Sequence, residues 1–276
     1  MKIFKKVAIV GVGLIGGSIA LDIKKRRLAL EVVGVSRHKN TLLLAKKNGV
    51  IDRGSQNIDI VKGADLIILA TPVSTILNLA PLIAKIISPA CIITDVGSTK
   101  QEIVAKLDKI FPKFVGSHPL AGSEKRGVSS ASCDIFKNSL CILTPTRETD
   151  PVALSRVRIL WNKLGARVLL LSAPRHDKIL SLVSHLPHAL AFSLIASIPN
   201  NYLRFSANGL KSATRIALSD SKLWADIFAS NQKNILQAMG LFKEGLYALS
   251  SAIRSKNKTQ IIKILEKAKK KREYLE

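Results

Sequence analysis

Short apolar runs alternate with helical segments through the first 172 residues, and this alternation constrains the fold more than any other feature of the chain. The strand-like runs are KVAIV, VVGV, LIILA, CIIT, KFVG, SLCILTPT and ARVLLLS, most of them apolar along most of their length rather than at every second position. Strands buried on both faces have this pattern, and helices between them favour parallel pairing. The sequence therefore predicts an α/β domain over residues 1–172, with a doubly wound, mostly parallel sheet.

The first strand runs into the sequence GVGLIGGS, in which Gly11, Gly13 and Gly16 have the spacing G-x-G-x-x-G. Alone this spacing is a weak pattern. Directly after a strand and at the start of a helix, it is the fingerprint of a Rossmann-type dinucleotide site, because the glycines allow the tight turn and the approach of the pyrophosphate. The alternative is a glycine turn without a ligand.

The end of the second strand bears on the choice of dinucleotide. NAD-binding chains commonly carry an acid there to hold the ribose 2′-hydroxyl, whereas this chain has Ser36 and Arg37. A hydroxyl and a guanidinium can bind a 2′-phosphate, so we expect NADP to be preferred, with NAD possible. Alternatively, Arg37 is a surface cation or stacks on adenine without discriminating. The residues expected at the dinucleotide are Gly11, Gly13, Leu14, Ile15, Gly16, Ser36, Arg37 and Thr71.

The pattern changes after residue 172, and no strand is predicted beyond that point. Residues 173–276 are expected to form an all-α domain that contributes to the substrate site and to a homodimer. Residues 177–198 are apolar on most faces, which predicts a buried helix with a kink at Pro187. The end of the chain, KNKTQIIKILEKAKKKRE, predicts an amphipathic helix with a solvated basic face.

The chain is strongly basic, with 43 Lys and Arg against 19 Asp and Glu and a formal net charge of +24. Such an excess indicates anionic partners or simply a solvated basic surface. The basic residues are spread along the chain and no nucleic-acid-binding motif accompanies them, so we expect no nucleic-acid partner. A dinucleotide-responsive protein that binds nucleic acid is the weakest of the alternatives considered.

Cysteine usage and hydropathy bear on the compartment and on metals. The three cysteines, Cys91, Cys133 and Cys141, are an odd number without a C-x-x-C pair, so neither a disulfide framework nor a zinc site is predicted. Glycines interrupt the apolar run near the N-terminus, which argues against a signal peptide. No segment is long enough to be predicted to span a membrane. These features predict a cytoplasmic protein without a metal.

Polar residues follow the strands at the edge where ligands bind in open α/β sheets. Thr71 follows LIILA, Asp95 and Ser98 follow CIIT, and His118 follows KFVG. Ser98 or Thr99 could equally cap the next helix. His118 could be a hydrogen-bonded structural residue or a group that moves a proton.

Five segments carry a resemblance to a known family. GVGLIGGS, DVGSTK, GSHPLAGSEKRGV, SHLPHALAF and TRIALSDSKLWADI occur in this order along the chain. In these segments the chain resembles the prephenate/arogenate dehydrogenase family of tyrosine biosynthesis. The resemblance implies NAD(P)-dependent oxidative decarboxylation of prephenate or arogenate, giving 4-hydroxyphenylpyruvate or tyrosine. The alternative is another NADP-dependent dehydrogenase or reductase of the β-hydroxyacid dehydrogenase type.

The resemblance also implies roles for individual residues. His118 matches the catalytic histidine that accepts a hydroxyl proton, and Ser98 a serine that bonds the same hydroxyl and helps to orient the histidine. The residues implied at the substrate are Arg215, His188, Glu124 and Trp224. Arg215 could instead form an interdomain salt bridge, and Glu124 could pair with a neighbouring cation.

Ser212, His185 and His176 also bear on the expected site. Where the family often has an acid before the arginine, this chain has Ser212, which makes gating by that position doubtful. His185 is expected to be a core histidine. His176 is expected to cap a helix or face solvent, outside the site.

Overall fold

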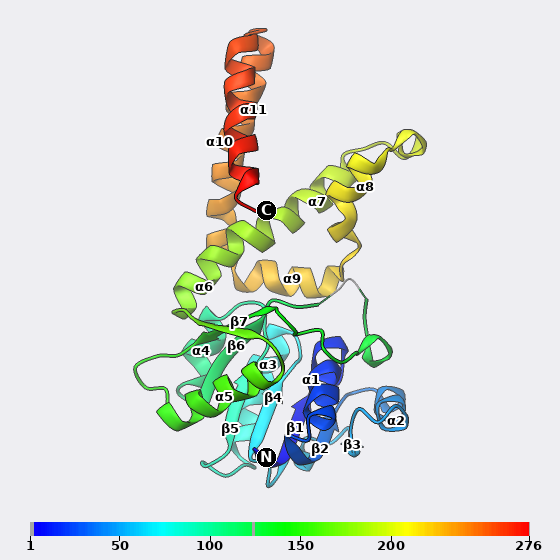
Figure 1. The fold of residues 1–276 in the computed structure, drawn as a ribbon, viewed down its shortest axis with the longest axis vertical. Coiled ribbons are helices and arrows are strands. Elements are labelled where there is room, and N and C mark those ends of the chain that lie inside the picture. The colour runs from blue at the N-terminus through cyan, green and yellow to red at the C-terminus, as the bar shows by residue number, and fades with distance from the viewer. Residues whose placement is uncertain (1–2, 123–124, 276) are drawn as a thin grey trace. The chain divides into compact units, whose positions relative to one another are not determined.

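The computed structural model describes residues 3–122 and 125–275. Its sheet has eight strands in the order β3-β2-β1-β4-β5-β6-β7-β8 (Figure 1). The strands are β1 Phe4–Val10, β2 Ala29–Val35, β3 Arg53–Ser55, β4 Leu66–Leu69, β5 Ile92–Asp95, β6 Phe114–Pro119, β7 Leu140–Thr144 and β8 Arg167–Leu170.

The strand pairing confirms the doubly wound, mostly parallel sheet. Pairs from β3 to β6 are parallel, whereas β7 runs antiparallel to β6, and β8 is parallel to β7. The order reverses between β1 and β4, so the turn after β1 lies at the topological switch point where such sheets bind ligands. The three-residue β3 was not predicted, because it has no apolar run.

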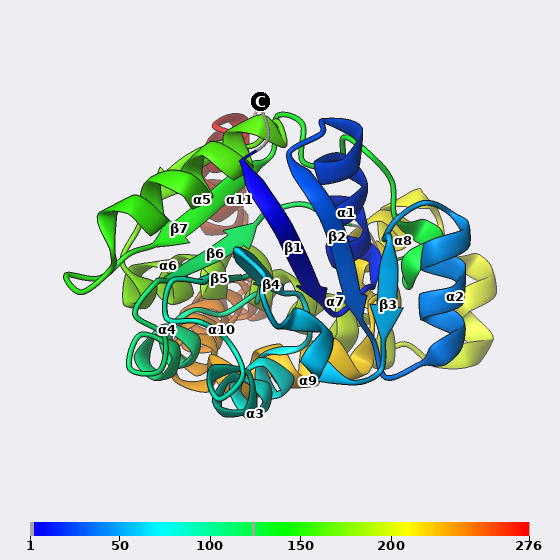
Figure 2. The ribbon, with the colours of Figure 1, turned by 90° about the horizontal axis from the view of Figure 1, so that it is seen from below.

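Helices cover both faces of the sheet (Figure 2). One face packs on α1, α2 and α5, with Trp161 and Phe136 wholly buried. The other packs on α3 and α4. Both faces of the central strands are apolar because helices cover them on both sides, as their mostly apolar sequences predicted, whereas the edge strands β3 and β8 are largely exposed. The helices are α1 Leu14–Lys25, α2 Lys39–Lys47, α3 Val73–Ala84, α4 Gln101–Leu107 and α5 Pro151–Lys163.

Helices follow the sheet from Ala173 onward. The next elements are α6 Ala173–Leu180, the π-helical turn η3 Ser181–His185, α7 Leu186–Ala196, α8 Asn208–Thr214 and α9 Ser221–Ser230. The predicted disturbance at Pro187 takes the form of the π turn just before it. Pro187 has no N–H to donate and its ring crowds the preceding turn, and a widened turn relieves both.

The helical stretch Ala173–Ala196 differs from its prediction in burial. Only part of it is buried, and Leu194 is 44% exposed. By length and composition alone this stretch of 24 residues could cross a membrane, so the expectation that no segment reaches that length was wrong. Its polar residues His176, Asp177 and His185 are nevertheless buried in hydrogen bonds, as in the core helix of a globular domain.

By internal contacts the chain divides into two compact units, residues 1–231 and 232–276. The first contains the sheet and the helices α1 to α9, so the boundary expected near residue 172 falls between β8 and α6, inside this unit. The second consists of α10 Gln232–Arg254 and α11 Lys258–Glu273. Helix α11 has no buried residue, in line with the predicted basic amphipathic helix.

Candidate active site

A cavity of about 770 Å³ lies at the carboxyl ends of the strands, within the first compact unit. Its walls come from the glycine turn after β1, the loops after β4, β5 and β6, and the helical segments η3, α7, η5 Arg215–Leu218 and α9. The predicted site residues that line it are Gly13, Leu14, Ile15, Thr71, Ser98, His118, His188, Arg215 and Trp224. The structure therefore brings together residues that are up to 211 positions apart in sequence.

The glycine turn fits a dinucleotide. Gly11 has φ +103°, and a Cβ there would stand 2.5 Å from the carbonyl oxygen of Ala70. A Cβ on Gly16 would collide with the carbonyl oxygen of Gly11, so this glycine lets α1 pack against the turn. Among the described residues nothing lies within 4 Å of the Cβ position of Gly13, which lines the cavity. The backbone at Gly13 is thus open to a phosphate group.

Two further features bear on the dinucleotide. Thr71 lines the cavity, and its buried hydroxyl has no hydrogen-bond partner among the described residues. An orphaned hydroxyl in a ligand cavity indicates a bond that a ligand completes. Ser36 and Arg37 follow β2 outside the cavity lining; Arg37 is exposed and its carbonyl accepts from the side chain of Gln56.

His118 lies in β6 and begins a chain of hydrogen-bonded groups. Its Nδ1 is 2.8 Å from Nε2 of His176 in α6, and the two ring centroids are 5.0 Å apart. Nδ1 of His176 is in turn 2.7 Å from a carboxylate oxygen of Asp177. His176 and Asp177 are both almost wholly buried, whereas His118 is partly accessible and lines the cavity.

On the side of the sheet, a buried ion pair supports this row of hydrogen-bonded groups. Lys100 and Asp95 are both fully buried and bonded to each other. Burial raises the pKa of Asp95, and the ammonium group of Lys100 opposes that rise. Backbone N–H groups of Gly97 and Ser117 also donate to Asp95. Removing either member would leave an uncompensated buried charge.

Burial keeps His118 neutral. It lowers the pKa of His118 well below its ordinary value, and positive charge on His176, Lys100 or His185 lowers it further. A neutral imidazole in a cavity is able to accept a proton from a bound hydroxyl group.

The helical segments of the cavity wall carry an aromatic stack and a cation. The ring of His188 stacks on Trp224 at 3.6 Å between centroids, and its Nδ1 donates to the carbonyl oxygen of Ser184. Arg215 begins the short helix η5 Arg215–Leu218 and lines the same cavity. These groups can bind a planar, anionic ligand.

The remaining predictions have mixed outcomes. Ser98 lines the cavity, but within the described chain no hydrogen bond links it to His118, so its orienting role stays a prediction. Helix α4 has no side-chain cap of its own; instead Asp177 accepts from the backbone N–H groups of Lys100 and Gln101. Glu124 lies outside the described residues.

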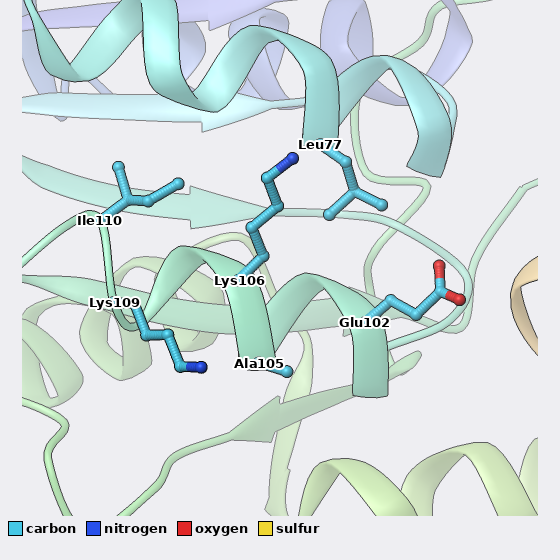
Figure 3. A pocket seen from close by; sticks show the side chains of 6 residues that line it. All are labelled: Leu77, Glu102, Ala105, Lys106, Lys109 and Ile110. Carbon is cyan, nitrogen blue, oxygen red and sulfur yellow. The ribbon is translucent and has the colours of Figure 1, made fainter.

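No group of three metal-ligating side chains occurs among the described residues. A second hollow lies between α3 and α4, lined by Leu77, Glu102, Ala105, Lys106, Lys109 and Ile110 (Figure 3). Its charged side chains belong to one short helix and its loop, and it shares no lining residue with the cavity, so it adds nothing to the chemistry of the site.

Sequence reasoning missed His176, which was expected to cap a helix or face solvent. It is instead buried and bonded to His118, 58 residues away. The adjacent pair His176–Asp177 at the start of an apolar helix was the available indication.

A dinucleotide turn and a neutral histidine that line the same cavity define the protein as an NAD(P)-dependent oxidoreductase. Two family models agree: residues 19–170 match the nucleotide-binding domain of prephenate dehydrogenase, and residues 172–267 match its dimerization domain. The chain belongs to the prephenate dehydrogenase family.

Individual relatives support this assignment. A prephenate dehydrogenase from Lactococcus lactis is 37% identical over 99% of this chain and 78% of its own length. A prephenate dehydrogenase from Aquifex aeolicus, solved with hydroxyphenyl propionate and NAD+, is 33% identical over 99% of this chain and 98% of its own, with a TM-score of 0.93. An arogenate dehydrogenase from Synechocystis is 28% identical over 98% and 100%, with a TM-score of 0.84. The β-hydroxyacid dehydrogenase alternative is not favoured.

Proposed function

We propose that the chain catalyses the NAD(P)-dependent oxidative decarboxylation of prephenate, arogenate or both, giving 4-hydroxyphenylpyruvate or tyrosine. The observation that carries this proposal is a neutral histidine, His118, in a cavity that also holds the glycine turn and Arg215. Relatives named for each substrate match the chain over nearly its whole length.

The residues of the chain divide the chemistry between them. When bound, the oxidised nicotinamide supplies the hydride acceptor for the ring carbon that bears the hydroxyl group. His118 accepts the proton of that hydroxyl through Nε2, a role typically worth about 10²–10⁴-fold in rate. Once the carboxylate has left as CO2 and the ring has become aromatic, the proton returns to the ring oxygen. The base therefore stores a proton rather than releasing it.

The substrate carboxylates need cationic and hydrogen-bonding partners. Arg215 suits a carboxylate because its guanidinium donates two parallel hydrogen bonds. His188 is held by Ser184 and by its stack on Trp224, so its Nε2 faces a fixed direction. We assign both residues, with Trp224 as an aromatic wall, to substrate binding. Ser98 is assigned to the hydroxyl group and Glu124 to the mouth of the site.

The choice between the two dinucleotides depends on the end of β2. Ser36 and Arg37 stand where a carboxylate would repel a 2′-phosphate, and Arg37 is exposed to solvent. We propose that NADP is preferred over NAD, although the Aquifex relative was solved with NAD+.

The assembly and surroundings of the chain are also proposals. The match to a dimerization domain and the exposed apolar residues of η3 and α7, such as Leu182 and Leu194, support a homodimer. A sedimentation mass equal to one 30.0 kDa chain would contradict it. The cofactor and a small anionic substrate are the ligands that we propose. We also propose that the protein is cytoplasmic and binds neither membranes nor nucleic acid. Salt-dependent binding to a DNA duplex or to lipid vesicles would contradict the proposed absence of these partners.

The decisive experiment follows the absorbance of reduced nicotinamide with prephenate and arogenate, each combined with NAD and NADP. Turnover in at least one combination is expected. No turnover in all four contradicts the proposed function. A kcat/KM about tenfold higher with NAD than with NADP contradicts only the proposed cofactor preference.

A further inference from the structure

The arrangement of His118, His176 and Asp177 determines which nitrogen of His118 faces the substrate. The carboxylate of Asp177 accepts hydrogen bonds from the backbone N–H groups of Lys100 and Gln101 at 2.7 and 2.9 Å. Both oxygens therefore act as acceptors, so the 2.7 Å contact from Nδ1 of His176 has to be a donated hydrogen bond. His176 carries its proton on Nδ1, and its Nε2 holds a lone pair.

The same reasoning extends one residue further. Nε2 of His176 is an acceptor, so Nδ1 of His118 at 2.8 Å must be the donor. A neutral imidazole carries only one proton. With that proton on Nδ1, Nε2 of His118 is unprotonated. Because Nδ1 is occupied by the contact with His176, Nε2 is the ring nitrogen available to a ligand in the cavity.

We propose that His176, held by Asp177, is a positioning residue that fixes His118 in the tautomer with a basic Nε2 and takes up the positive charge when His118 accepts the substrate proton. This inference rests on the proposed role of His118 as the base.

The proton transfer balances atom by atom. The O–H bond of the substrate breaks and an Nε2–H bond forms on His118. The Nδ1–H bond of His118 breaks and an Nε2–H bond forms on His176, which keeps its Nδ1–H bond to Asp177. The charge comes to rest beside a carboxylate instead of at the cavity wall. When CO2 leaves, both protons return along the same path.

The surroundings of the two rings favour placing the positive charge on His176 over leaving it on His118. Burial and nearby cations lower the pKa of His118 well below its ordinary value, so a proton held on that ring alone is costly. Burial also lowers the pKa of His176, but the hydrogen bond and the charge of Asp177 counteract it. The charged or titratable groups around the two rings are Asp95, Lys100, Cys141, Asp177 and His185.

Two substitutions separate the effect of His176 on the tautomer of His118 from its ability to accept a proton. In His176→Gln the amide oxygen can occupy the place of Nε2 and accept from His118, but the side chain cannot be protonated. In His176→Leu the acceptor is lost. We expect kcat to fall at least about tenfold in the Gln variant and about a hundredfold or more in the Leu variant, with KM within about twofold of wild type in both.

Nitrogen-15 NMR of the histidine rings gives a readout that needs no substrate. We expect His118 to be protonated on Nδ1 in the wild-type protein and in His176→Gln, and to become a mixture of tautomers in His176→Leu. A wild-type His118 protonated on Nε2 overturns the proposal, even if neither variant folds. Wild-type kcat in a folded His176→Leu also overturns it. Absence of turnover by wild-type protein would instead contradict the proposed function and leave the tautomer measurement intact.

Discussion

His118 is the residue on which the chemistry depends most directly. Replacing it with asparagine keeps a polar side chain in β6 but removes a group that can hold a proton. We expect kcat to fall about 10²–10⁴-fold in His118→Asn. Stopped-flow or steady-state absorbance of reduced nicotinamide measures the change.

The control for this variant is its affinity for the dinucleotide, measured by fluorescence titration. Because the glycine turn belongs to a different strand, that affinity should stay within about twofold of wild type. A kcat within about threefold of wild type would falsify the assignment of His118 as the base.

The sequence predicts that His118 lies in the site, but it does not predict its contact with His176, for a physical reason. His118 follows an apolar strand at the edge of the sheet where ligands bind, and a strand end can be recognised locally. The partnership with His176 exists only because α6 packs against that edge, 58 residues further along. A histidine beside an aspartate at a helix start has the same local appearance when it faces solvent, so burial was the missing information.

At the scale of elements, the contact between α1 and the turn after β1 depends on the absence of a side chain at Gly16. Substituting Gly16→Ala would drive a methyl group into the carbonyl oxygen of Gly11 and against Ile9. We expect dinucleotide affinity to fall at least about tenfold, and the free energy of unfolding by about 1–3 kcal/mol, because an overpacked contact must shift the helix. Fluorescence titration and thermal unfolding measure the two effects.

Gly209→Ala is the matched control. Gly209 lies in α8, and no described atom is within 4 Å of its Cβ position. Alanine should therefore leave dinucleotide affinity unchanged and stabilise the helix by up to about 1 kcal/mol. If Gly16→Ala kept the wild-type affinity for the dinucleotide, the close approach of α1 to the turn would not be needed for dinucleotide binding.

Elements with strong local patterns were predicted, and elements defined by their neighbours were not. The strands β1, β4 and β5 each contain a short apolar run, and their existence follows from the sequence. The direction of β7 relative to β6 depends on the connection between them, which has no distinctive pattern. Similarly, the helical pattern around Pro187 predicted a kink, but the π turn that accommodates it arises from the backbone geometry of that particular helix.

At the scale of the molecule, the apolar residues of α7 show the limit of predicting burial from composition. Their pattern indicates a buried helix, yet side chains such as Leu194 remain exposed in the single chain. An apolar composition predicts that a helix is buried. It does not predict whether the surface that buries the helix belongs to the same chain or to a second copy.

Buried histidines should also make the stability of the whole molecule depend on pH. Burial lowers the pKa of His185 from 6.5 to about 4. The unfolded chain therefore binds a proton more readily than the folded one between these pH values. Stability from this group is complete above pH 6.5 and is lost as the pH falls toward 4. Between pH 6.5 and 5 the loss from His185 alone is about 2 kcal/mol.

The variant His185→Asn tests this dependence. Asparagine can still accept the hydrogen bond from Asn231, which lies 3.1 Å from Nδ1 of His185, but it does not titrate. Urea unfolding at pH 7 and pH 5 should therefore show a smaller loss of free energy in the variant than in wild type. Equal losses in wild type and His185→Asn would mean that other groups account for any destabilisation by acid.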